Sequence, residues 1–222
     1  MALVIDDLGR SLADLDTLAD LGVPLSYAVL PFESMTPQVV AELRARGAEI
    51  LCHLPMAPAS DRNPGPGALG RDMPPRALAR ATRAALEAVP AAVGVSNHMG
   101  SELSSDAGAM RAILGVAAER GLFYLDSRTS AESAGYRTAL ELGIPAAERD
   151  VFLDADPRAA AIEREFQRLL ALARERGAAI GIGHPHPSTL EALARLVPAA
   201  RQRGYEFVPL SYLLDRPGEL PE

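Results

Sequence analysis

The 222-residue sequence contains no lysine and no tryptophan, and its single cysteine is Cys52. Without lysine the chain cannot use a Schiff-base mechanism or a phosphate-binding loop built on a lysine amine. One cysteine cannot form a disulfide within the chain, so we expect no covalent crosslink in the fold. No apolar run approaches the roughly 18 residues that a transmembrane helix needs, so we expect no membrane span.

Positive charge is also scarce. The 22 basic side chains, all arginine, face 29 acidic ones, and the net charge is −7. Broad nucleic-acid binding usually needs a basic surface, so nucleic acid is not an expected partner. The 48% hydrophobic and 23% charged residues are typical of a folded globular chain. This length allows one large domain or two small ones, with a sizeable core. Because no break in composition marks a second domain, we expect a single domain over residues 1–222.

Short apolar runs alternate with segments of helical periodicity. The expected strands are 3–6, 25–30, 49–53, 93–96, 122–126, 151–153, 179–183 and 206–209, and the expected helices are 11–21, 37–46, 75–88, 106–120, 159–176 and 188–203. This order predicts parallel strands with crossover helices. Seven or eight such units favour a closed or nearly closed (β/α) barrel, with an open doubly wound sheet as the alternative. The irregular stretch 56–75 is long enough to be a functional loop.

Residues with useful chemistry gather at the ends of the expected strands. All four histidines and three of the aspartates stand there: His53, His98, His184, His186, Asp6, Asp7 and Asp126. In parallel α/β folds the carboxyl ends of the strands form one rim, on which sites are built. We therefore expect these side chains to meet, although a single histidine taken alone is more often a hydrogen-bonded structural residue.

Imidazoles together with a carboxylate suit a divalent metal, with zinc as the expected ion and an open position for water. Strand alternation places Asp6 and Asp7 on opposite faces. Unless the chain leaves the strand at this point, only one of them can be a ligand. The other is then a base or an outer partner, and an ordinary surface turn is the competing interpretation.

Six strings, in order along nearly the whole chain, resemble the divergent polysaccharide deacetylases. They are IDDLG at 5–9, GAEILCHLPM at 47–56, NHMGS at 97–101, LDSRTS at 125–130, DVFLD at 150–154 and GIGHPHP at 181–187. The resemblance implies an α/β fold, the irregular seven-stranded (β/α) barrel of the polysaccharide deacetylase superfamily. It also implies metal-dependent removal of acetyl groups from a carbohydrate. Family members usually carry an export leader or anchor, which implies a periplasmic or cell-envelope location, although the few residues before Asp6 are too short for a leader.

The resemblance also implies roles for individual residues. It makes Asp6 the base, Asp7 and His53 metal ligands, and His184 a group at the end of a late strand. The better-studied branch of the superfamily has a second histidine four residues after the first, where this chain has Ala57. We infer that His98 supplies the missing ligand.

The remaining roles complete the expected site. His184 or His186 is expected to protonate the leaving group. Asp126 is expected to orient a histidine and to stabilise its positive charge. The residues expected to contact the acetylated carbohydrate substrate are Asn97, Met99 and Ser127.

Two alternatives to a carbohydrate deacetylase remain open. Ala57, where divergent members often carry a glutamate, suits a non-catalytic envelope protein that kept the barrel and the metal. The third motif, NHMG where the better-studied branch has arginine and tyrosine, suits a hydrolase of a different amide or ester.

Overall fold

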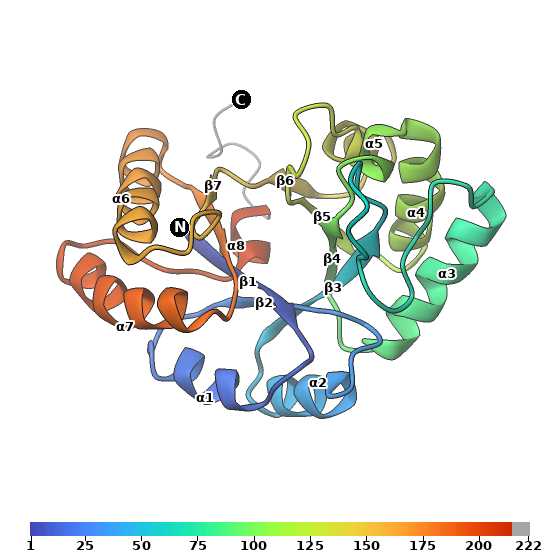
Figure 1. Cartoon of the computed structure of the whole chain (residues 1–222). Coiled ribbons are helices and arrows are strands. Elements are labelled where there is room, and N and C mark those ends of the chain that lie inside the picture. The colour runs from blue at the N-terminus through green and yellow to red at the C-terminus, as the bar shows by residue number, and fades with distance from the viewer. Residues whose placement is uncertain (215–222) are drawn as a thin grey trace.

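The structure, a computed structural model that describes residues 1–214, is built on one curled parallel sheet ringed by helices (Figure 1). The strands are β1 Ala2–Leu8, β2 Ser26–Val29, β3 Glu49–Met56, β4 Gly94–Met99, β5 Phe123–Asp126, β6 Ala146–Glu148, β7 Val151–Phe152 and β8 Ile180–Gly183. They lie in the order β6-β5-β4-β3-β2-β1-β8-β7, and every pairing is parallel. The expected parallel sheet with crossover helices is therefore confirmed.

The sheet does not close into a full barrel within the described residues. Strands β6 and β7 form its two edges, yet only Arg149 and Asp150 separate them in the chain. Two residues span at most about 10 Å, so the two edges approach each other without pairing. The fold is thus a half-barrel, and the expected count of seven strands is wrong because the described chain has eight. We call the gap between these edges the β6–β7 seam.

Two strand predictions fail for local reasons. Strand β6, of sequence Ala-Ala-Glu, was missed because it has no β-branched or aromatic residue to mark it. The expected strand 206–209 is absent: Met1 exchanges backbone hydrogen bonds with Glu206 and Val208, but Pro209 has no N–H to extend the ladder. Helix α8, Leu210–Leu214, begins immediately afterwards.

The six expected helices are all present, within two residues at each end. They are α1 Ala13–Ala19, α2 Thr36–Ala45, α3 Pro75–Ala88, α4 Ala107–Glu119, α6 Ala159–Arg176 and α7 Pro187–Gln202, and they are joined by the unforeseen α5 Gly135–Glu141, α8 and the short 3₁₀ turn η1 Leu103–Ser105. No helix within residues 1–214 is long and apolar enough to cross a membrane.

Alternation along the strands produces two apolar layers. On β1, Leu3 and Ile5 pack into the layer between sheet and helices, whereas Ala2 and Val4 face the inside of the half-barrel. The inner layer is covered at the amino ends of the strands by Leu210 and Leu213 of α8, together with other apolar side chains. The polar side chains that face inward are therefore found at the carboxyl ends of the strands, where the candidate site lies.

Close packing inside the sheet gives a stability prediction. A Cβ added to Gly94 would lie 2.3 Å from the ring of buried Phe123, whereas one added to Gly115 of α4 would meet nothing within 4 Å. We expect Gly94→Ala to lower the free energy of unfolding by about 1–3 kcal/mol through overpacking. Gly115→Ala, the matched control, should raise it by about 0.5–1 kcal/mol, because alanine suits a helix interior better. Denaturant titration measures both; equal effects would contradict this account.

Candidate metal centre

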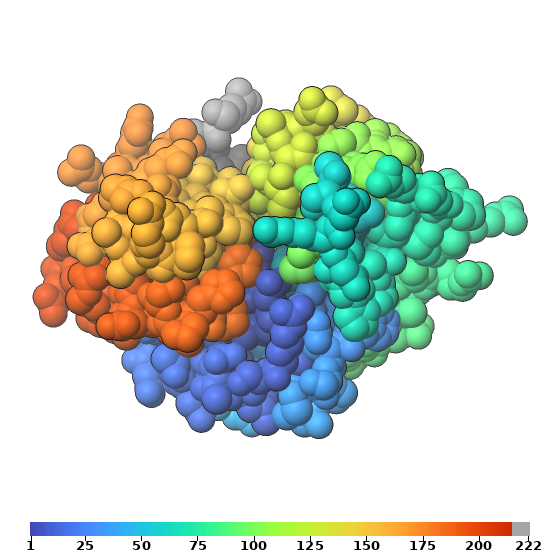
Figure 2. Space-filling view, viewed as in Figure 1, coloured from blue at the N-terminus to red at the C-terminus, as the bar shows by residue number. Residues whose placement is uncertain are grey.

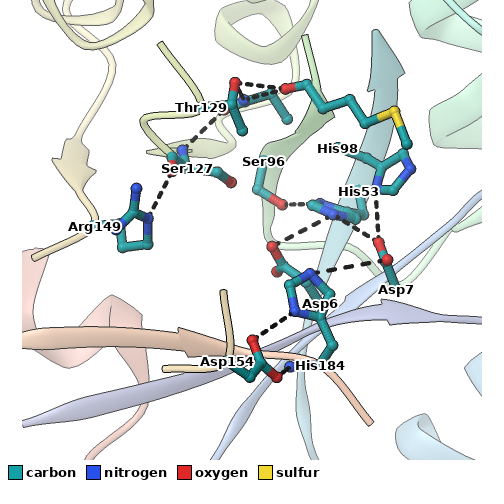
Figure 3. A network of polar contacts seen from close by, with 12 residues as sticks. Asp6, Asp7, His53, Ser96, His98, Ser127, Thr129, Arg149, Asp154 and His184 are labelled. Carbon is teal, nitrogen blue, oxygen red and sulfur yellow. Dashed lines mark hydrogen bonds and ion pairs between the residues drawn. The ribbon is translucent and has the colours of Figure 1, made fainter. Parts of the chain in front are cut away.

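Strand alternation brings the expected site residues to the inner face at the carboxyl ends. Asp6 is the next inward position after Val4 on β1. His53 of β3, His98 of β4 and His184, directly after β8, turn toward the same point (Figure 3). Figure 2 shows this region as a hollow, with the end of β1 at its floor and the loop after β3 along one side. We call it the rim hollow.

Asp7 breaks the alternation of β1, and this irregularity explains how both adjacent carboxylates can face the site. Its φ of 61° lies in the left-handed region, and the register of β1 with β2 shifts between Ile5 and Leu8. The Asp7 side chain therefore turns to the same side as Asp6. Asp6 Oδ2 lies 3.4 Å and Asp7 Oδ1 3.3 Å from His53 Nε2. Backbone strain of this kind costs about 1–3 kcal/mol and is concentrated at functional sites.

Asp7, His53 and His98 could hold a metal ion. One ligand atom from each lies within 4.8 Å of the other two. Asp7 Oδ1 is buried and lies 2.6 Å from His98 Nδ1, yet no aligned hydrogen-bond donor among the described residues satisfies it. An unsatisfied buried carboxylate oxygen facing two imidazole nitrogens is the donor set of a divalent cation site. The residues present therefore fit the expected ion.

The surroundings of Asp6 and Asp7 shift the pKa values of the two carboxylates in opposite directions. Burial raises the pKa of Asp6, although the nearby charge of His53 opposes the shift. Burial acts on Asp7 in the same direction, but its contacts with His53 and His98 hold its pKa well below the usual range. Asp7 is thus the carboxylate suited to bind a cation, and Asp6 the one suited to take up a proton.

Ser96 fixes the orientation of His53. Its Oγ lies 2.7 Å from His53 Nδ1, and both side chains are buried. With Nδ1–H donating to this hydroxyl, Nε2 is left free to face the carboxylates.

We expect Ser96→Ala to weaken metal affinity by about 10–100-fold, the usual cost of losing a group that orients a ligand. Ser133→Ala, which removes a hydroxyl bonded to Asp126 instead, should leave the affinity unchanged. Competition with a zinc-binding dye measures both. An equal loss in the two variants would mean that Ser96 acts through general stability.

His184 stands opposite the ligand group and is held by Asp154. Asp154 Oδ1 lies 2.9 Å from His184 Nδ1, and Oδ2 accepts hydrogen bonds from the His184 backbone N–H at 2.6 Å and from Thr189 Oγ1 at 2.7 Å. His184 Nε2 faces Asp7 Oδ2 at 3.9 Å. Burial favours the neutral imidazole, but the hydrogen bond and charge of Asp154 outweigh it and raise the pKa of His184 to about 9.

His186 lies on the outer side of the pair formed by His184 and Asp154. Its ring is exposed and stacks on that of His184 with centroids 5.6 Å apart. Asp154, His184 and His186 form a second group whose ligand atoms lie within 4.8 Å of one another. Both Asp154 oxygens already accept hydrogen bonds, which makes this group a poorer cation site than Asp7, His53 and His98.

The expected role of Asp126 is wrong. Its oxygens accept hydrogen bonds from the backbone N–H groups of Arg128 and Tyr136 and from Ser133 Oγ, and no histidine within residues 1–214 contacts it. It closes the turn after β5. Sequence analysis missed Asp154, the carboxylate that supports a histidine, although it lies in the quoted DVFLD string.

The expected substrate contacts have different outcomes. Asn97 is 1% exposed, and its amide is used internally: Oδ1 accepts from Tyr124 Oη and the Ser127 N–H, while Nδ2 donates to the Met99 carbonyl. Asn97 therefore joins the ends of β4 and β5, and its contact with substrate stays a prediction. Ser127 Oγ is buried without a hydrogen-bond partner among the described residues, and Met99 has a left-handed φ of 52°.

Arg149, which no sequence pattern marked, is fixed beside the hollow. Its Nε donates to the Ser127 carbonyl at 2.7 Å (Figure 3), and its Nη2 donates to the Arg128 carbonyl at 3.0 Å. Size alone does not locate the site, since a cavity of about 820 Å³ lies at the amino ends of the strands beside Met1 and α8.

Solved structures share this fold. Atu2773 of Agrobacterium tumefaciens C58 superposes with a TM-score of 0.83 at 27% identity, over 96% of this chain and 87% of its own. The Bc1960 peptidoglycan N-acetylglucosamine deacetylase has a TM-score of 0.60 at 15% identity, over 95% and 86%. BA3943 of Bacillus anthracis, a CE4 family pseudoenzyme, has a TM-score of 0.56 at 13% identity, over 96% and 64%. The last two likenesses show the fold alone.

Sequence comparison is more specific. The uncharacterized protein YibQ of Escherichia coli K12 is 35% identical over 197 residues, which are 89% of this chain. The match covers 62% of that relative, so the chain spans less than two thirds of its length. The family model described as divergent polysaccharide deacetylase matches residues 3–214. The chain therefore belongs to the divergent polysaccharide deacetylase family.

Proposed function

We propose that this chain is a zinc-dependent hydrolase that removes acetyl groups from a carbohydrate of the cell envelope. One observation carries the proposal: a three-residue ligand group, a separate buried carboxylate and a carboxylate-supported imidazole surround the same hollow. These are the parts that metal-assisted hydrolysis of an amide or ester needs. Family membership supports the acetylated carbohydrate as substrate.

Asp7, His53 and His98 would hold the zinc ion and leave a position open for water. When bound, such an ion lowers the pKa of the water and polarises the acetyl carbonyl. Ser96 keeps His53 in the orientation that this role requires.

Asp6 and His184 would move the protons. Asp6 lies beside the ligand group, with its Oδ1 buried and unpaired among the described residues, and accepts a proton from the attacking water. His184, held at Nδ1 by Asp154, presents Nε2 to the hollow from the opposite side and donates a proton to the leaving nitrogen or oxygen. The C–N or C–O bond breaks, and acetate and a free amine or hydroxyl result.

A non-catalytic metal-binding envelope protein is the second candidate, favoured by Ala57. Ala57 has no ligand atom in its side chain, and its backbone pairs with Leu69 and Leu103 instead. The inclusion of His98 in the ligand group supports the hydrolase, because the number of protein ligands remains three.

Hydrolysis of a chromogenic acetyl ester, with and without added zinc, separates these candidates. We expect zinc-dependent turnover for the hydrolase and none for a binding protein that nevertheless takes up zinc. A comparison of acetylated sugar oligomers with simple acetamides then tests the substrate. Equal rates on both would point to a hydrolase of a different amide or ester.

A further inference from the structure

A cavity of about 280 Å³ lies between the segment 149–156, which begins at the β6–β7 seam, and the first turns of α6. Three arginines line it, Arg149, Arg164 and Arg168, together with the acidic residues Asp156 and Glu165. We call it the seam cavity. Three basic groups around one small cavity are unexpected in a chain with a net charge of −7.

Arg149 brings a fixed charge without a counter-ion. Its hydrogen bonds go to two neutral backbone carbonyls, and its guanidinium carbon lies 4.9 Å from the centre of the Phe152 ring. No carboxylate within residues 1–214 lies within 4.0 Å of this guanidinium. Burial lowers the pKa of Arg149, Asp6 opposes this, and the positive charge of Arg168 adds to the lowering. An anion in the cavity would relieve the repulsion between these arginines.

Arg164 is the second arginine of the cavity without an ion pair, although its charge acts on Asp156 at longer range. Its only hydrogen bond among the described residues is to the Ala160 carbonyl at 3.4 Å, and it forms no ion pair in that part of the chain. The two acidic residues of the cavity are already paired, Asp156 with Arg158 and Glu165 with Arg168. The seam cavity therefore has an excess of positive charge in a form that can bind a carboxylate.

Phe152 lies between the seam cavity, which it lines, and the rim hollow. Its ring centre is 4.9 Å from the guanidinium carbon of Arg149 and 5.2 Å from the centre of the His184 ring. A substrate group in the cavity would therefore be one aromatic ring away from the imidazole proposed to protonate the leaving group. We propose that the seam cavity binds a carboxylate of the sugar substrate, so that the substrate class is an acidic acetylated carbohydrate; this inference rests on the proposed function.

Two sugars, one of which carries an additional lactyl ether that ends in a carboxylate, test the inference. The methyl glycoside of N-acetylmuramic acid carries a lactyl carboxylate, and the methyl glycoside of N-acetylglucosamine lacks it. Calorimetric titration uses the Asp6→Asn chain loaded with zinc, so that neither sugar is consumed. We expect the acidic sugar to bind about tenfold more tightly at low salt, with the preference shrinking as salt is added.

Adding Arg164→Gln should abolish this preference while affinity for the neutral sugar is retained. Arg174→Gln is the matched control, because Arg174 is also exposed on α6 and without an ion pair in residues 1–214. Ten residues along a helix place it about 15 Å from Arg164, at the far end. The control should keep the preference.

The outcomes distinguish this inference from the proposed function. Equal affinity for the two sugars, no measurable binding of either, or a preference that Arg164→Gln leaves intact would each overturn the carboxylate subsite. Hydrolysis of the neutral sugar by the wild-type chain would then leave the proposed function standing. Conversely, a preference that depends on Arg164 in a chain that hydrolyses neither sugar would support the subsite and contradict the hydrolase.

Discussion

His98→Ala is expected to eliminate zinc binding and, with it, hydrolysis. Elemental analysis after equilibration with zinc should give about one ion per wild-type chain and close to none for the variant, because a structural or catalytic zinc needs at least three protein ligands. His98 Nδ1 is the group nearest to Asp7 Oδ1, at 2.6 Å. The loss of activity should exceed the roughly 10–100-fold that removal of an outer partner costs.

His186→Ala is the control that separates the two candidate ligand groups. His186 belongs to the second group, with Asp154 and His184, and its ring is exposed. Its removal should leave zinc content unchanged. If His186→Ala lost the ion and His98→Ala kept it, the centre would lie at Asp154 and His184, and the assignment of Asp7 and His53 as ligands would be wrong.

The positions of the histidines could be predicted because they depend on a general property of parallel sheets. Each histidine follows an apolar run, and parallel strands carry their carboxyl ends to one rim. Within a strand, alternation decides which residue faces inward. Val4 is apolar and inward in the structure, so Asp6 is inward as well, and the same reasoning holds for Leu51 and His53.

The role of Asp7 could not be predicted from alternation. A left-handed φ at a non-glycine residue is uncommon, and nothing in the string IDDLG requires it. In the structure the φ of Asp7 is 61°. This backbone angle turns a side chain that alternation would place outward toward His53 and His98. Met99 and Arg128, the other described non-glycine residues with positive φ, also stand at strand ends beside the site.

The partner of His184 was missed because sequence order does not give strand order. Asp126 and Asp154 both end apolar runs, and either could support a histidine on sequence grounds. The sheet order places β7 next to β8, so Asp154 meets His184, whereas β5 lies on the far side of β4. Arg149 was missed for the same reason, because its position depends on the seam between the two edge strands β6 and β7.

Asp6→Asn should reduce kcat by about 10²–10⁴-fold, the usual contribution of a positioned acid or base. Asparagine has the same shape but takes up no proton at neutral pH. Zinc content should be unchanged, because Asp6 is outside the group of Asp7, His53 and His98. The fold should tolerate the change, since burial already disfavours the charged form of this 2% exposed side chain.

The neighbouring variant Asp7→Asn gives the contrast that makes this result specific. Asp7 Oδ1 is close to both His53 and His98, so its replacement should remove the ion as well as the activity. Steady-state kinetics and elemental analysis on the two variants therefore separate a base from a ligand at adjacent positions. Loss of zinc in Asp6→Asn would make Asp6 a ligand and leave the water without its proposed base. Full activity with zinc retained would assign proton transfer to another group, with His184 as the remaining titratable side chain that faces Asp7.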